Sequence, residues 1–190
     1  MGGDAPVIDA LCPGFVDLRW TSQSAGDLAA RISTLPETAQ LPCLGATLEK
    51  LNAEHSPVWT SKCDFWPALQ AVEFDPDELD APTGSSAHAV GCYIDLLPKG
   101  SQQWPFPDAP VSSCMESSCI DLCNRLHSFP LRCCRVDLIV RRAQVAPGLV
   151  DLGITAYITA SGHTSVEAIR TLEAALAVFA DALGAPSTLQ

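Results

Sequence analysis

Apolar and polar residues alternate in five segments of the chain, which is the period of a strand with one buried face. The segments are residues 15–21, 57–66, 88–97, 131–142 and 149–160. In the last two segments the apolar positions are even-numbered, from Cys134 to Val140 and from Val150 to Ile158. The short connection between these two segments, QVAPG, predicts a β-hairpin.

Four other segments repeat apolar residues at the spacing of an amphipathic helix. They are residues 27–35, 44–55, 113–128 and 164–183. Ser113 with Glu116, and Thr164 with Glu167, match the capping box that begins a helix. The last helix carries one apolar stripe, made of Val166, Ile169, Leu172, Leu176, Phe179 and Leu183. This stripe predicts that the helix lies on a sheet.

The order of these elements predicts an α+β protein: an antiparallel or mixed sheet of about five strands with helices on one face. Its first six elements match the βαββαβ order of the ferredoxin-like fold, followed by an extra strand and a C-terminal helix. The predicted organisation is an extended N-terminal segment at 1–14, a single α+β domain at 15–184 and a C-terminal tail at 185–190. The proline-rich segments 36–42, 67–87 and 98–112 separate the units.

If the helices cover the apolar side of every strand, the other side forms one surface, here called the open face. Strand alternation predicts that Trp59, Cys63 and Phe65 point toward the helices. The same alternation assigns these residues to the open face: Asp17, Arg19, Thr60, Lys62, Asp64, Trp66, Tyr93, Asp95, Cys133, Arg135, Asp137, Arg141, Asp151, Thr155, Tyr157 and Thr159.

The open face gathers cations, aromatic rings and carboxylates, a mixture that holds a polar small molecule by charge-assisted hydrogen bonds and ring stacking. The candidate ligand-binding residues are Arg19, Lys62, Asp64, Trp66, Tyr93, Cys133, Arg135, Asp137, Arg141 and Tyr157. In this hypothesis the face binds a polar small molecule or a partner. Two alternatives stay open: charged residues that only pair across strands, and a homo-oligomer that assembles through this face. The pattern does not decide whether the protein is an enzyme.

Cysteine is the second notable feature. Five of the nine cysteines, at positions 114, 119, 123, 133 and 134, lie in one short stretch without any CxxC pair. Because Cys119 and Cys134 occupy apolar stripes, the favoured interpretation is free thiols in the core, with no metal ligands and no cofactor. The alternative is a thiol- or metal-dependent protein that uses Cys114, Cys119, Cys123 and Cys133. Within it, Cys133 beside Arg135 is the more reactive candidate.

Charge and composition narrow the classes of partner. The chain has 190 residues with 22 acidic and 11 basic side chains, a formal charge of −11, and no long basic run. Such a chain repels nucleic-acid phosphates and anionic lipid headgroups, so neither nucleic acid nor membrane is expected as a partner. The first residues lack a secretory-signal pattern, and we expect a cytoplasmic protein. Residues 161–165, SGHTS, are interpreted as a helix cap, with an anion site as the alternative.

Overall fold

The computed structural model describes residues 18, 25–69, 74–75, 77–79, 81, 88–99, 111–146 and 149–184. The predicted extended segment 1–14, Arg19 and the predicted tail 185–190 lie outside the described residues. Leu18 is the one described residue of the predicted first strand, and it is buried in the core without belonging to a strand. Among the described helices, none is both long enough and apolar enough to cross a membrane.

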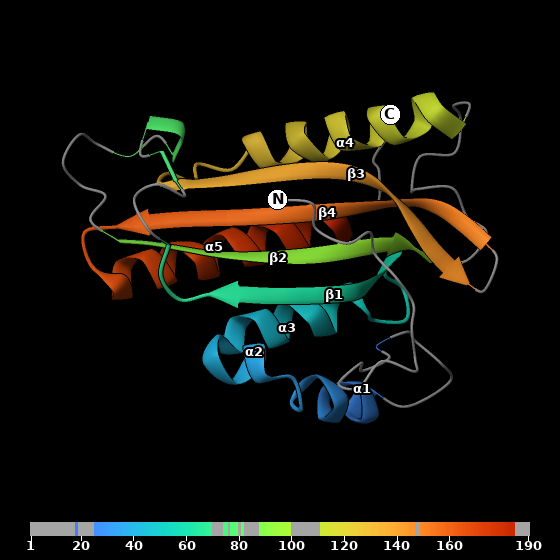
Figure 1. The fold of residues 1–190 in the computed structure, drawn as a ribbon, viewed down its shortest axis with the longest axis horizontal. Helices are drawn as coiled ribbons and strands as arrows, with labels where there is room; N and C mark the ends of the chain where they lie inside the picture. Colours follow the sequence, from blue (N-terminus) through green and yellow to red (C-terminus); the bar gives the residue numbers. More distant parts are fainter. Residues whose placement is uncertain are drawn as a thin grey trace.

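The core of the fold is a four-stranded antiparallel sheet (Figure 1). Its strands are β1 (Val58–Trp66), β2 (His88–Pro98), β3 (Cys134–Ala146) and β4 (Leu149–Gly162), and they stand in the order β1-β2-β4-β3. The predicted hairpin of β3 and β4 is confirmed. The ferredoxin-like arrangement is not confirmed, because β4 stands between β2 and β3, where that arrangement would place the first strand.

In the described part of the chain, five α-helices accompany the sheet: α1 (Ala25–Ile32), α2 (Pro36–Gln40), α3 (Pro42–Leu51), α4 (Val111–His127) and α5 (Ser165–Gly184). A short 3₁₀ helix, η1 (Asp77–Leu79), lies against β3 and β4. Helix α5 packs on β4 and β2, and α3 packs on α5 and β1. In Figure 1 the sheet is seen from the side opposite α5, with α4 at the β3 side of the molecule.

Helix α2 falls in a proline-marked segment that the sequence pattern treats as a separator. Pro36 begins α2 and Pro42 begins α3, each at the first helical position. Proline is tolerated there, because its missing N–H would have no partner within the helix. The Oγ1 of Thr38 donates hydrogen bonds to the carbonyls of Ile32 (3.0 Å) and Leu35 (2.8 Å). These bonds tie α2 to the end of α1.

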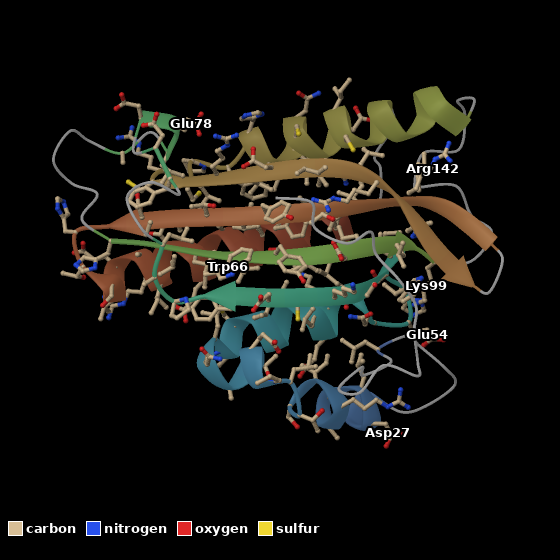
Figure 2. All side chains as sticks on the ribbon, viewed as in Figure 1. Asp27, Glu54, Trp66, Glu78, Lys99 and Arg142 are labelled. Carbon is tan, nitrogen blue, oxygen red and sulfur yellow. The ribbon has the colours of Figure 1, made fainter. Side chains whose placement is uncertain are left out.

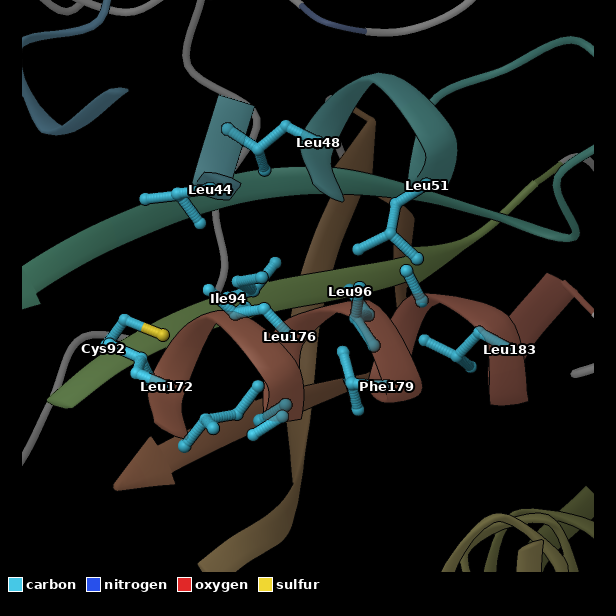
Figure 3. Packing of buried hydrophobic residues seen from close by; sticks show 14 of the residues in the cluster. Leu44, Leu48, Leu51, Cys92, Ile94, Leu96, Leu172, Leu176, Phe179 and Leu183 are labelled. Atoms are coloured by element: carbon cyan, nitrogen blue, oxygen red, sulfur yellow. The ribbon is translucent and has the colours of Figure 1, made fainter. Parts of the chain in front are cut away.

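The main hydrophobic core lies between α5, α3 and the sheet (Figure 3). Leu176 and Phe179 of α5 are completely buried in one cluster with Ile94 of β2 and Leu48 of α3. Full burial of such side chains contributes about 1.5–3 kcal/mol each. The predicted stripe on the last helix is thus confirmed except at Val166, which is 56% exposed. Val166 lies in the first turn of α5, where Ala168 is buried instead.

The start of α5 is the predicted one. The Oγ1 of Thr164 accepts a hydrogen bond from the N–H of Glu167 (3.2 Å), and Oε2 of Glu167 accepts one from the N–H of His163 (2.9 Å). A Cβ placed on Gly162 would lie 2.7 Å from the N of Ala168, so the turn that enters the helix needs glycine. The cap therefore accounts for this segment without a ligand.

Candidate functional site

A β-bulge in β1 changes which of its side chains reach the open face. Thr60 pairs with Leu96 and Cys63 with Ile94, so β1 has one more residue than β2 over this interval. The extra residue reverses the alternation, and Trp59 pairs with Leu97 on the open face. The prediction that Trp59 points toward the helices and Thr60 toward the open face is therefore wrong.

Both displaced side chains have defined partners. Trp59 forms a small apolar cluster with Leu97 and Ala143, and its Nε1 donates a hydrogen bond to the Pro98 carbonyl (3.1 Å). On the helix side, Thr60 Oγ1 accepts a hydrogen bond from Asn52 Nδ2 (2.7 Å), and the Thr60 N–H donates to Asn52 Oδ1 (2.9 Å). The buried Asn52 thus satisfies the backbone where the ladder between the strands is interrupted.

Beyond the bulge, the strand register aligns the predicted residues in rows across the open face. Asp64 pairs with Tyr93, Tyr93 with Tyr157, and Tyr157 with Asp137. These four residues form what is here called the central row. Its two tyrosines lie on the inner strands and its two carboxylates on the edge strands. The central row therefore brings four of the predicted site residues together.

Three aromatic rings form a compact group, the ring cluster, over the middle of the open face. The ring centroid of Trp66 lies 5.7 Å from that of Tyr93 and 6.4 Å from that of Tyr157, and the two tyrosine centroids are 5.8 Å apart. The rings of Trp66 and Tyr157 are almost parallel, with 6° between their planes, and Tyr93 is tilted against both. Trp66 pairs with Gly91, where a Cβ would lie 3.4 Å from the indole. A Cβ at Gly91 would therefore touch the indole of Trp66, which is labelled in Figure 2.

A hydrogen bond holds Tyr157, and burial keeps Tyr93 uncharged. Nη2 of Arg141 donates a hydrogen bond to Oη of Tyr157 (3.1 Å), and its guanidinium carbon lies 5.9 Å from the centroid of that ring. Burial, with added repulsion from Asp95 and Asp64, raises the pKa of Tyr93 to about 12. Tyr93 therefore stays a neutral phenol that can donate a hydrogen bond.

Asp95 is the most buried charged side chain of the open face, with 3% of its surface exposed. Thr155 Oγ1 donates a hydrogen bond to its Oδ1 (2.5 Å). Burial raises the pKa of Asp95 above its usual value, while the bond from Thr155 and the charges of Lys62 and Arg141 oppose this rise. The sequence placed Asp95 and Thr155 on the open face but not among the site residues. The sequence signal that could have identified Asp95 is the presence of an aspartate inside an otherwise apolar strand.

Arg135 is held by two carboxylates of its own chain. Its Nε donates a hydrogen bond to Asp137 Oδ1 (2.8 Å), and Nη1 contacts Glu78 of η1. These contacts raise the pKa of the Arg135 guanidinium, so the side chain is permanently charged and paired. Figure 2 labels Glu78 at this end of the sheet. Arg135 was predicted to anchor a ligand by its charge, and the structure shows the charge engaged within the molecule.

Cys133 lies outside the strand to which alternation assigned it. Strand β3 begins at Cys134, and Cys133 has a positive φ of 59°. Its carbonyl accepts a hydrogen bond from the N–H of Ser161 (2.8 Å). Because a left-handed residue interrupts the pleat, the alternation along β3 does not fix the direction of this side chain.

The described thiols are consistent with a structural role. Burial raises the pKa of Cys43 and Cys119 to about 11 and that of Cys63 to about 12. Cys92 is fully buried, and Cys134 packs against the core. Such thiols are poor nucleophiles, because the reactive form is the thiolate. Within the described part of the chain, no three His, Cys, Asp or Glu side chains are grouped so that they could hold a metal ion.

Comparison with protein-family models, with curated proteins and with solved structures gave no match to this chain.

Proposed function

We propose that the open face binds a planar small molecule, neutral or positively charged, which stacks on the ring cluster. The observation that carries this proposal is the position of Trp66, Tyr93 and Tyr157: they are half-buried, their centroids are within 6.4 Å of one another, and the two tyrosines stand in the central row between two carboxylates. Aromatic faces attract flat rings and cations, and carboxylates at the rim accept hydrogen bonds from amino groups.

The preference against anions comes from how the described cations are used. Arg135 contacts Asp137 and Glu78, while Lys62 and Arg141 act on the buried Asp95. The positive charge of Arg135 is therefore balanced locally, and the chain as a whole carries −11. In this proposal the rings provide the binding energy, and the cations shape the site rather than attract the ligand.

The same observations favour a small molecule over a nucleic acid. Aromatic side chains on a sheet also stack nucleic-acid bases, but such surfaces follow the phosphates with basic side chains. Here the edge positions of the central row are carboxylates.

Three probes that share an indole ring but differ in charge test the proposal. Binding of tryptamine, indole and indole-3-acetate to the full chain would be measured by isothermal titration calorimetry. We expect tryptamine, a cation at neutral pH, to bind tightest and indole-3-acetate weakest. Trp66→Leu should weaken tryptamine binding by about tenfold, because stacking of one ring is worth about 1–3 kcal/mol. Equal affinity for all three probes, tightest binding of the anion, or no binding at millimolar concentration would contradict the proposal.

A matched control separates the ring cluster from general effects of losing an aromatic residue. Phe129 is an exposed aromatic side chain that follows α4, away from the ring cluster. Phe129→Leu should leave the affinity for tryptamine unchanged. If both variants weaken binding equally, the probe binds elsewhere and the ring cluster is not the site.

A further inference from the structure

Large apolar side chains are exposed mainly in one part of the described structure. Ile120 belongs to α4, Phe129 to the turn after it, and Ile139 and Val140 to the middle of β3. Ile139 is 41% and Val140 42% exposed. The two β3 residues point to opposite faces of the same strand, so both sides of this strand expose apolar surface. Apolar surface gathered in this way marks an interaction site.

Strand β3 is also an edge of the sheet. It pairs with β4 on one side, and no described strand pairs with its other side. It has 13 residues, which is long for an edge strand. The outward N–H and C=O groups of such a strand form a template to which another strand can add.

We propose that two copies of this chain associate through β3, antiparallel, with the twofold axis at Ile139. A continuous sheet that keeps the helices of both copies on one side requires paired residues to point to the same face. The axis must then pass through a residue position rather than between two residues. With the axis at Ile139, this residue meets its own copy, and Leu138 meets Val140 of the second copy.

The charges along β3 favour this register over those with the axis at Leu138 or Asp137. With the axis at Ile139, Asp137 lies opposite Arg141 of the second copy. With the axis at Leu138, Arg135 lies opposite Arg141, and with the axis at Asp137, two aspartates face each other. Like charges directly opposite destabilise a strand pair. Like charges thus oppose edge pairing in these two registers, whereas the axis at Ile139 brings opposite charges together.

Helix α4, which carries the exposed Ile120, also lies near the proposed junction. This helix lies at the β3 side of the molecule, where it contacts α5 (Figure 1). A twofold axis at the β3 edge brings the two α4 helices to either side of the junction.

Sedimentation equilibrium of the full chain over a wide concentration range tests the proposal. The wild-type chain should be a dimer, and Ile139→Lys should be a monomer, because it places two like charges at the axis. Val166→Lys introduces the same charge at an exposed apolar residue of α5, away from the edge, and should stay dimeric. A monomeric wild type, or a dimer that Ile139→Lys leaves intact, would overturn the proposal. Trp66→Leu should stay dimeric, and its dissociation would assign assembly to the open face instead.

Charge exchange tests the register. Asp137→Arg and Arg141→Asp should each weaken the dimer, and the double variant should restore it. If the double variant is weaker than both single variants, the register is wrong.

Hydrogen exchange of the wild-type chain needs no substitution and stays informative if a variant fails to fold. Amides of β3 should exchange more slowly at high protein concentration, while those of β1, at the opposite edge, should not change. Equal exchange of β3 at all concentrations would exclude this interface.

Discussion

The same strands build two unlike surfaces, one under the helices and one on the open face. In β2, Cys92, Ile94 and Leu96 point toward the helices and are completely buried. Between them, Tyr93 and Asp95 point to the open face, where each contacts a named partner on β4. The helix side is specified by apolar area removed from water, and the open side by a small set of directed contacts.

This difference predicts a ranking of energies. Loss of a buried aliphatic or aromatic side chain removes many contacts and leaves a cavity. A ring pair or an exposed ion pair is worth about 1 kcal/mol or less. The helix side therefore sets the stability of the fold, and the open face can change its chemistry at little cost in stability.

The largest expected effect is on the helix side. Phe179→Ala should lower the free energy of unfolding by about 3–5 kcal/mol, since it removes a completely buried ring. Urea denaturation followed by circular dichroism measures this loss. Val166→Ala, on the same helix but exposed, should change it by less than about 0.5 kcal/mol. Equal losses would mean that α5 is not packed as described.

The second-largest loss of stability is expected at the β-bulge in β1. Asn52→Ala leaves the N–H of Thr60 without its buried acceptor, which should cost about 1–3 kcal/mol of unfolding free energy. Thr60→Ser keeps the hydroxyl that accepts from Asn52 and should cost much less. The same denaturation measurement compares them. A neutral Asn52→Ala would show that the bulge does not depend on this contact.

The bulge also shows what the sequence could and could not predict. Alternation assigned the facing of β2, of β3 from Cys134 to Arg142 and of β4 from Leu152 onward correctly, because the pairing there runs without a register shift. In β1 the residues before the bulge were assigned to the wrong faces. An inserted residue leaves the local pattern unchanged and is visible only in the pairing with β2. Helix α2 was missed because Pro36, which begins it, and Pro42, which begins α3, resemble a separator unless each is recognised as a first helical residue.

The candidate site was predictable in part for the same reason. Parity placed Trp66, Tyr93 and Tyr157 on one face, but only the register shows that they meet in one cluster. Likewise, parity could not show that Arg135 reaches Glu78, because the two residues are 57 positions apart in sequence. Contacts between distant segments depend on register and loop position, which a local pattern does not contain.

A pH-dependent effect distinguishes Asp95 from the rest of the open face. Because burial raises its pKa in the folded state, the folded chain holds this proton more tightly than the unfolded chain. Stability should therefore fall as pH rises from about 4, the ordinary aspartate pKa, through the higher folded-state pKa, and then level off. Asp95→Asn should lack this fall. Thermal or urea denaturation at a series of pH values measures the difference between the two proteins.

Thr155→Val sharpens this test. The hydroxyl of Thr155 donates to the Asp95 carboxylate and opposes the rise in its pKa. Without that bond the folded-state pKa should rise further, and the fall in stability should extend to higher pH. A wild-type stability that increases with pH relative to Asp95→Asn over this range would show that the nearby cations outweigh burial.

The smallest effect is expected at an exposed charged contact of the open face. Arg135→Gln removes the pairing with Asp137 and Glu78, all three of which are partly exposed to water. Such pairs contribute about 0.2–1 kcal/mol, and salt screens them. The loss of unfolding free energy should therefore shrink when denaturation is repeated in high salt. A loss above about 2 kcal/mol, unchanged by salt, would mean that η1 is held on β3 and β4 by this contact, and that the open face contributes to stability as the helix side does.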